Sequence, residues 1–133
     1  VGSEMCIRDS SGIDTRAVVI DNGSGLSRSE RISAAAMSSV LQFQWRSTRM
    51  PEFIASLPLV GIDGTMKRRL EQTSVRGQAH IKTGTLVDVS SIAGYLTAKS
   101  GRRIIVTCII NHPNAGDARD ATDALLQWIV ERY

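Results

Sequence analysis

The sequence of 133 residues predicts one α/β piece of the α+β type, in which helices flank an antiparallel sheet. Residues 90–98 alternate between two faces, as a strand does, and residues 103–110 form a mostly apolar strand. Only the turn residues 100–102 separate these strands, so they must pair antiparallel. Helical periodicity both precedes and follows them, which places helices beside the sheet.

The elements expected before the sheet are short. Residues 15–20 are rich in β-branched side chains and predict a strand, and the Gly-rich residues 21–27 predict a turn or loop. Ser33 is a suitable N-cap for a helix over 34–45. Pro51 starts a second helix that runs to about Ser56.

The second half should carry the sheet and one long helix. Gly61–Thr65 predicts a loop and Met66–Leu70 a helical turn. Strands are expected at 79–86, 90–98 and 103–110, the last being apolar on both faces like a central strand. A helix over 117–132 should pack through one face, made by Ala118, Ala121, Leu125, Trp128 and Ile129.

The composition excludes several classes of protein. Hydrophobic residues are 42% and charged residues 22%, which suits a packed core. The net charge of +3 is too small and dispersed to indicate nucleic acid binding, and no apolar run is long enough to cross a membrane. Two cysteines make no disulfide framework, and no metal-ligand spacing is present, so neither a metal nor an organic cofactor is expected.

Residues 1–10 lack the regions of a signal peptide and resemble a translated sequencing adapter. We expect this segment to be foreign to the natural protein, and residues 11–133 to form the folded piece.

The motif Lys82-Thr83-Gly84 is the strongest local feature, and Thr85 follows it. A lysine on a strand can attract an anionic substrate and assist proton movement, and a threonine hydroxyl can hydrogen-bond a carboxylate. Glycine lets a substrate backbone approach the strand, and the next residue can offer its N–H to an oxyanion. Taken alone, the tripeptide favours an ordinary strand that carries a surface lysine, because three-residue matches occur by chance in many proteins.

Four motifs in order give this tripeptide a context. They are Asn22-Gly-Ser-Gly-Leu-Ser-Arg28, Gly61-Ile-Asp-Gly-Thr65, Lys82-Thr-Gly-Thr-Leu86 and Ser91-Ile-Ala-Gly-Tyr95. In their order and approximate spacing, the chain resembles the C-terminal part of the D-alanyl-D-alanine carboxypeptidase/endopeptidases, the class C low-molecular-mass penicillin-binding proteins of peptidase family S13. The resemblance covers roughly residues 14–133, and Asn111 also matches.

The resemblance implies the C-terminal part of a serine β-lactamase/transpeptidase-like domain. It implies an extracytoplasmic enzyme that hydrolyses peptidoglycan stem peptides through an acyl-enzyme and is acylated by β-lactam antibiotics. Lys82 would act in electrostatics and proton relay, Thr83 would bind the substrate carboxylate, and Gly84 would permit close approach. Thr85 would supply an oxyanion-hole N–H, with its hydroxyl near the carboxylate. No contact with nucleic acid or membrane is implied.

The chain departs from the family in one decisive respect. No serine is followed by lysine three residues on or by asparagine two residues on, so the nucleophile motif and the second motif lie outside this chain. We therefore predict that the chain alone neither hydrolyses peptides nor binds penicillin covalently. A β-lactamase fragment, a non-catalytic penicillin-binding-like module and a truncated reading frame without independent function remain as alternatives.

Several other residues have two interpretations. His80 would share a face with Lys82 and act near the site, or be structural. His112, next to Pro113, would be a general base or a turn residue. Asp63 would line a cleft or stabilise a turn, and residues 67–69 would form a solvated basic face or contact an anionic glycan. Cys108 is expected to be a buried apolar residue, and Trp128 to pack its helix.

Overall fold

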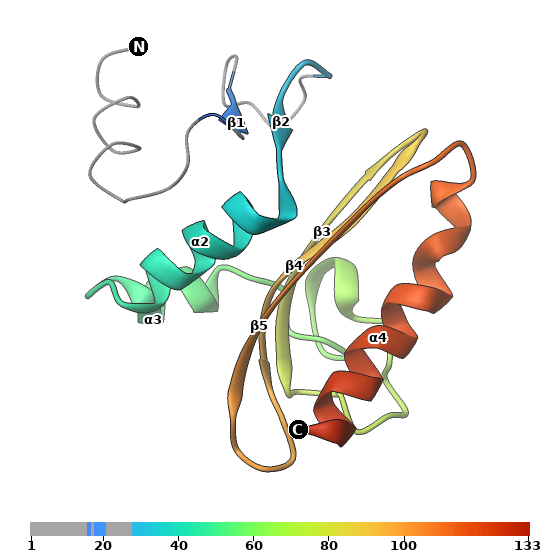
Figure 1. Ribbon diagram of the computed structural model, residues 1–133. Helices are drawn as coiled ribbons and strands as arrows, with labels where there is room; N and C mark the ends of the chain where they lie inside the picture. The colour runs from blue at the N-terminus through green and yellow to red at the C-terminus, as the bar shows by residue number, and fades with distance from the viewer. Residues whose placement is uncertain (1–15, 17, 21–27) are drawn as a thin grey trace.

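The computed structural model describes residues 16, 18–20 and 28–133 (Figure 1). The predicted loop at 21–27 and the segment 1–10 therefore lie outside the described residues. In chain order the elements are β1 (Val18–Val19), β2 (Arg31–Ile32), α2 (Ala34–Trp45), α3 (Met50–Ala55), the 3₁₀ turn η2 (Gly64–Met66), β3 (Ala79–Leu86), β4 (Val89–Thr97), β5 (Arg103–Asn111), η3 (Ala115–Ala118) and α4 (Arg119–Arg132).

The main sheet has three antiparallel strands in the order β3-β4-β5. Ala79 pairs with Leu96 in β3 and β4, and Val89 pairs with Asn111 in β4 and β5. The antiparallel sheet with flanking helices confirms the predicted fold class. In the described residues β4 is the central strand and β5 ends the sheet, so the expectation that 103–110 is central is not met here.

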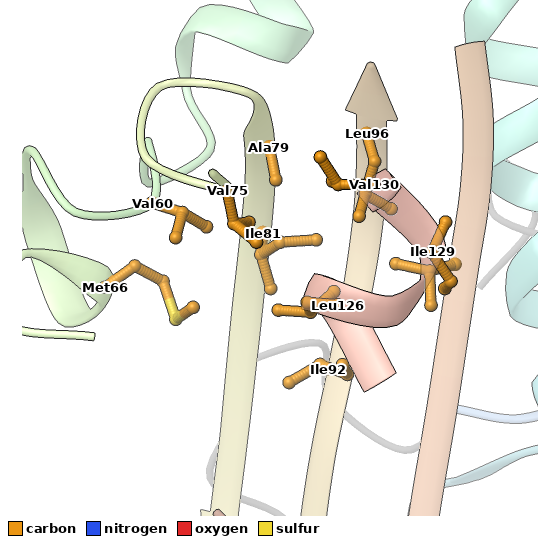
Figure 2. Close-up of a cluster of buried hydrophobic side chains, with 11 residues drawn as sticks. Val60, Met66, Val75, Ala79, Ile81, Ile92, Leu96, Leu126, Ile129 and Val130 are labelled. Carbon is orange, nitrogen blue, oxygen red and sulfur yellow. The ribbon is translucent and has the colours of Figure 1, made fainter. Parts of the chain in front are cut away.

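Two helices cover opposite faces of the sheet, α4 on one and α2 on the other (Figure 1). Beneath α4 lies one apolar core, in which alternate residues of the strands meet the helix (Figure 2). Its members are Val60, Met66, Val75, Ala79, Ile81, Ile92, Leu96, Val106, Leu126, Ile129 and Val130. Strands β4 and β5 are covered on both faces, which explains why residues 103–110 are apolar on both sides.

Helix α2 begins where its cap predicts. The Ser33 hydroxyl accepts a hydrogen bond from the Ala36 N–H at 3.1 Å. The hydroxyl of Tyr95, on β4, donates to the carbonyl oxygen of Leu41 at 2.7 Å and ties the helix to the sheet. Trp45 and Phe53 pack on the same tyrosine ring, with centroids 5.3 and 6.4 Å from it. Tyr95 thus joins α2, α3 and the sheet.

The packing face of the last helix agrees with the predicted one at Ile129 and Leu125, which pack in or against the core, and differs from it at Trp128. Its buried residues are Thr122, Leu126, Ile129 and Val130. Trp128 is 52% exposed and stacks edge-on against Tyr133 at 5.8 Å, so its expected packing role is wrong. Successive residues of an α-helix are about 100° apart, so a face that buries Leu126 and Val130 places Trp128 on the opposite side of the helix.

None of the helices in the described part of the chain is long and apolar enough to span a membrane.

Candidate functional site

The outer edge of β3 is covered at its start and open at its end. The Val60 N–H donates to the Ala79 carbonyl, and the Ile81 N–H donates to the Pro58 carbonyl, both at 2.9 Å. Backbone groups alternate between the two sides of an antiparallel strand. The N–H and C=O of Thr83 and Thr85 therefore also point to this outer edge. No backbone group of the described residues pairs with them there.

The side chains of the Lys-Thr-Gly motif lie around this open edge. Lys82 is exposed, and its ammonium donates to the Thr83 carbonyl. Thr83 is half-buried and Thr85 is exposed. Lys82 shares a face with His80, and Thr83 shares the opposite face with Ile81, because side chains alternate along a strand. An extended ligand beside the edge would thus have a cation on one side and hydroxyl groups on the other.

Gly84 leaves room for a neighbouring side chain as well as for a ligand at the open edge. A Cβ atom added at this position would lie 2.6 Å from the Ser91 hydroxyl oxygen. The Ser91 hydroxyl makes a long contact of 3.4 Å with the Gly84 carbonyl. The glycine therefore lets β4 present a hydroxyl directly beside the motif, a packing reason that the sequence alone does not reveal.

A second loop reaches the motif from a distance of 18 residues. The Thr83 hydroxyl donates to the Thr65 hydroxyl at 3.0 Å. Thr65 belongs to the Gly61–Thr65 motif, so the structure brings two of the four motifs into contact. Sequence reasoning singled out Asp63 in this loop and passed over Thr65. The signal that could have found it is its place at the end of the same motif.

The loop that carries Thr65 is firmly anchored. Met66 is fully buried in the core, next to the exposed Thr65. Arg69 donates to Asp123 of α4 through Nε at 2.9 Å and to Thr122 through Nη2 at 2.9 Å. The side chains of Arg69 and Asp123 are only 11% and 18% exposed. Arg69 is therefore a structural residue, and the expectation of a solvated face holds only for Lys67 and Arg68.

A cavity of about 740 Å³ lies on the α2 side of the sheet, next to the end of the motif. Its wall combines charged and apolar groups from β2, α2 and the three strands. They include Arg28, Glu30, Met37, Leu86, Ser91 and Asn111. Ser91 lines this cavity and also contacts the Gly84 carbonyl, so the cavity lies beside the motif.

The remaining candidates have structural positions. Asp63 accepts a hydrogen bond from the Leu59 N–H at 2.6 Å, which is the turn role. His112 accepts from the Asn114 N–H at 3.0 Å within its turn. His80 is half-buried, and its Nδ1 has no hydrogen-bond partner among the described residues. Cys108 is partly buried and packs against the core as predicted.

The site lacks a nucleophile within the described residues. No hydroxyl or thiol there is paired with a lysine or histidine as an activated nucleophile requires. The motif at 22–28 lies outside the described residues, except for Arg28 in the cavity wall. Among the described residues no group of three or more His, Cys, Asp or Glu could hold a metal ion.

Comparison with known proteins gives a consistent family. The model of the D-Ala-D-Ala carboxypeptidase 3 (S13) family matches residues 5–132. The chain is 31% identical over 126 residues to a D-alanyl-D-alanine carboxypeptidase of Actinomadura sp. (strain R39), covering 90% of the chain and 23% of that relative. It is 33% identical over 132 residues to carboxypeptidase DacB of Mycolicibacterium smegmatis, covering 94% and 28% respectively.

Solved structures show the same fold. Penicillin-binding protein 4 of Haemophilus influenzae superposes with a TM-score of 0.76 at 25% identity, over 92% of this chain and 30% of that one. A predatory endopeptidase of Bdellovibrio bacteriovorus gives 0.81 at 16% identity, over 96% of this chain and 35% of that one, a likeness of fold alone. The chain spans about a quarter of the length of the two carboxypeptidases above.

Proposed function

The chain belongs to the D-Ala-D-Ala carboxypeptidase 3 (S13) family, and from this we propose that it is the C-terminal part of a serine-type D-Ala-D-Ala carboxypeptidase/endopeptidase. The substrates would be peptidoglycan stem peptides. The observation that carries the proposal is the open edge of β3, where Lys82, Thr83 and Thr85 meet.

The geometry assigns a task to each group. A stem peptide laid along the edge would place its terminal carboxylate within reach of the Lys82 ammonium and the threonine hydroxyls. The Thr85 N–H points out of the sheet edge, where it can donate to the oxygen of a tetrahedral intermediate. Gly84 has no side chain, so a substrate backbone can approach this part of the strand closely. These residues would bind and polarise the substrate, and none of them forms the covalent bond.

The covalent steps need a serine from outside the chain. Its oxygen would attack the carbonyl carbon of the D-Ala-D-Ala bond, and its proton would pass to the leaving amine of the terminal D-Ala. Water would then cleave the ester and regenerate the serine. A β-lactam would be opened by the same attack and would remain attached. The isolated chain should therefore be inactive, while the complete protein should react.

The cellular location follows from the substrate. Peptidoglycan lies outside the cytoplasmic membrane, so the complete protein would act in the periplasm or cell envelope. A relative of known structure was solved with a β-lactam, the Haemophilus influenzae penicillin-binding protein 4, which supports β-lactams as ligands of the complete protein.

The alternative is a non-catalytic penicillin-binding-like module. The complete gene separates the two, because the enzyme would carry a Ser-x-x-Lys and a Ser-x-Asn motif upstream and the module would not. Such a module would bind stem peptides without cleaving them. A β-lactamase fragment has less support, because the matching relatives are carboxypeptidases.

The test begins with the complete gene. Its DNA is sequenced upstream of residue 11, which also shows whether the codons for residues 1–10 are natural. The complete protein and the 133-residue chain are then incubated with a fluorescent penicillin and with a peptide that ends in D-Ala-D-Ala. We expect labelling and D-Ala release from the complete protein only. Binding without either reaction would favour the non-catalytic module, and labelling of the short chain would contradict the assignment.

A variant links that activity to the edge. Lys82→Ala in the complete protein should lower acylation by about 100-fold or more, the usual scale for loss of one preorganised electrostatic group. Lys67→Ala, an exposed lysine outside the site, is the matched control and should react like the unaltered protein.

A further inference from the structure

We propose that residues 58–60, which we call the stop segment, end the substrate-binding edge of β3 and limit the leaving group of the reaction to two residues. The stop segment lies along the outer edge of β3 just before the Lys-Thr-Gly motif. The side chain of Asp63 would be the positioning residue that holds it there. This inference rests on the proposed function and adds a determinant of substrate length to it.

The first argument is the direction in which a substrate would lie. The contacts proposed above place its terminal carboxylate near Lys82 and its scissile carbonyl at the Thr85 N–H. The substrate backbone then runs from Thr85 toward Lys82, antiparallel to β3, which runs from Ala79 to Leu86. Any residue added beyond the carboxylate would continue along the edge toward Ile81.

The second argument is that the protein itself occupies the edge at that point. The Ile81 N–H donates to the Pro58 carbonyl oxygen at 2.9 Å. The next residue, Leu59, forms an antiparallel bridge with His80. The stop segment therefore follows the line along β3, and the direction, that a longer substrate would need.

The pairing pattern of antiparallel strands gives the number of residues that fit. If the acyl residue of the substrate pairs with Thr85, the first leaving residue lies opposite Gly84 and the second opposite Thr83. A third would lie opposite Lys82. The chain that enters Pro58 already takes up this space, because consecutive Cα atoms are only about 3.8 Å apart. A leaving group of one or two residues fits, and a longer one would have to displace the stop segment or leave the edge.

The third argument is that the stop segment is firmly held. The Leu59 N–H donates to the Asp63 carboxylate at 2.6 Å, and the Leu59 carbonyl accepts from the N–H groups of Ile62 and Asp63, both at 3.1 Å. The Val60 carbonyl accepts from the Gly77 N–H at 2.9 Å. The Val60 side chain is fully buried in the core (Figure 2). A substrate could displace this segment only by breaking several paired backbone groups.

The turn that contains Asp63 also packs on the proline ring. Gly64 follows Asp63 with φ = +52°, and a Cβ atom added there would lie 3.0 Å from two ring carbons of Pro58. Proline has a fixed φ and no N–H that could be left unpaired. The ring therefore forms a rigid end to the open part of the edge.

The experiment varies the length of the leaving group without varying its charge. The complete protein is incubated with peptides that contain D-Ala-D-Ala and end in a carboxamide, either directly or after one, two or three glycines. Mass spectrometry measures kcat/KM for cleavage between the two D-Ala residues. We expect kcat/KM to fall by about tenfold or more between one added glycine and two, since the second glycine makes the third leaving residue.

Variants of Asp63 connect this length penalty to the stop segment. Asp63→Ala frees the Leu59 N–H, so the segment can yield, and the penalty for the second glycine should shrink by about threefold or more. Asp63→Asn keeps an acceptor oxygen and should keep the penalty. Asp120→Ala, which removes an exposed carboxylate on α4, is the control and should also keep it. Melting curves verify folding, and Pro58→Gly replaces Asp63→Ala if the alanine variant does not fold.

The outcomes are distinct. A rate that is unaffected by length, or that falls evenly with each glycine, would overturn the inference. The same holds for an unchanged penalty in the folded Asp63→Ala or Pro58→Gly protein. In these cases acylation by penicillin shows that the proposed function stands. Complete protein that neither releases D-Ala from the free acid nor reacts with penicillin would overturn the proposed function, and this inference with it.

Discussion

The guanidinium of Arg69 joins Asp123 across 54 positions of the chain, with Nε 2.9 Å from Oδ1. A second nitrogen of the same group donates to the Thr122 hydroxyl, which in turn donates to the Arg119 carbonyl at 2.8 Å. This network fastens the loop after Thr65 to the first turns of α4. Because Thr65 of the same loop contacts Thr83, this loop joins the Lys-Thr-Gly strand to α4.

Replacement of Arg69 by alanine should therefore destabilise the fold. Both partners are mostly buried, and the change leaves the Asp123 carboxylate and the Thr122 hydroxyl without a donor. We expect the free energy of unfolding to fall by about 1–3 kcal/mol in urea titrations. Arg68→Ala, next to it but exposed, should change it by less than about 0.5 kcal/mol. Equal effects of the two replacements would contradict the network's role.

Gly94→Ala should be far more damaging than other Gly→Ala changes. A Cβ atom at 94 would lie 2.0 Å from the His80 carbonyl oxygen, so β3 and β4 would have to separate. At Gly84 the obstacle is the Ser91 hydroxyl, a side-chain end that can rotate away. We expect Gly94→Ala to lower the free energy of unfolding by about 3 kcal/mol or to prevent folding. Gly84→Ala should lower it by at most about 1 kcal/mol.

Gly116 provides the control for this comparison. A Cβ atom there has no neighbour within 4 Å, and the residue lies in the 3₁₀ helix η3. Gly116→Ala should be neutral or slightly stabilising in the same unfolding measurements. If Gly84→Ala or Gly116→Ala lowered the free energy of unfolding more than Gly94→Ala did, β3 and β4 would not be packed as described.

Tyr95→Phe should change how stability depends on pH. Burial raises the pKa of Tyr95 above its ordinary value of 10.0. The folded state then holds the Tyr95 proton more tightly than the unfolded state. The resulting contribution to the free energy of unfolding is complete below pH 10 and is lost as pH rises through the folded pKa. At neutral pH the free energy of unfolding of the variant should be about 1 kcal/mol lower, because the hydrogen bond to the Leu41 carbonyl is gone.

The difference in free energy of unfolding between the unaltered protein and the Tyr95→Phe variant should shrink above pH 10. Urea unfolding at pH 7, 9, 10 and 11 measures it, over the range in which both proteins remain folded. A difference that stays constant or grows above pH 10 would be incompatible with a buried, hydrogen-bonded Tyr95.

Thr85→Pro tests the proposed oxyanion donor in the complete protein. Proline removes one N–H, and at 85 that N–H points to the open edge and away from β4. The sheet should therefore tolerate the change, as edge strands do. Acylation by penicillin should fall by about 100- to 1,000-fold, the usual cost of one oxyanion-hole donor. Thr85→Ala keeps the N–H and removes only the hydroxyl, so its acylation rate should fall much less, by about tenfold at most.

The sequence alone predicted the elements whose signals are local. The Ser33 cap placed helix 34–45 correctly, and the alternation at 90–98 with the turn at 100–102 placed β4 and β5 within a residue. Pro51 placed the short helix, which starts one residue earlier at Met50. These predictions succeed because capping, turn and periodicity preferences act over a few neighbouring residues.

Contacts between distant segments were not predictable in this way. The Lys67–Arg69 run gave no sign that its third residue turns inward to Asp123, because a basic run has the same composition whether solvated or paired. Trp128 sits at helical spacing from apolar residues, yet α4 buries the face of Leu126 and Val130 and leaves Trp128 on the opposite side. The Thr65–Thr83 contact depends on where a loop folds back, which only the tertiary structure fixes.

The open end of β3 has a consequence for handling the protein. Unpaired backbone groups at a strand edge are a template for pairing with another chain. Here they are followed by Leu86 and Val87, which are 46% and 80% exposed, so the tip of the hairpin is apolar as well. The features that would admit a peptide also favour edge-to-edge aggregation of the 133-residue chain at high concentration. Its solubility should improve when an added peptide or the rest of the enzyme occupies that edge.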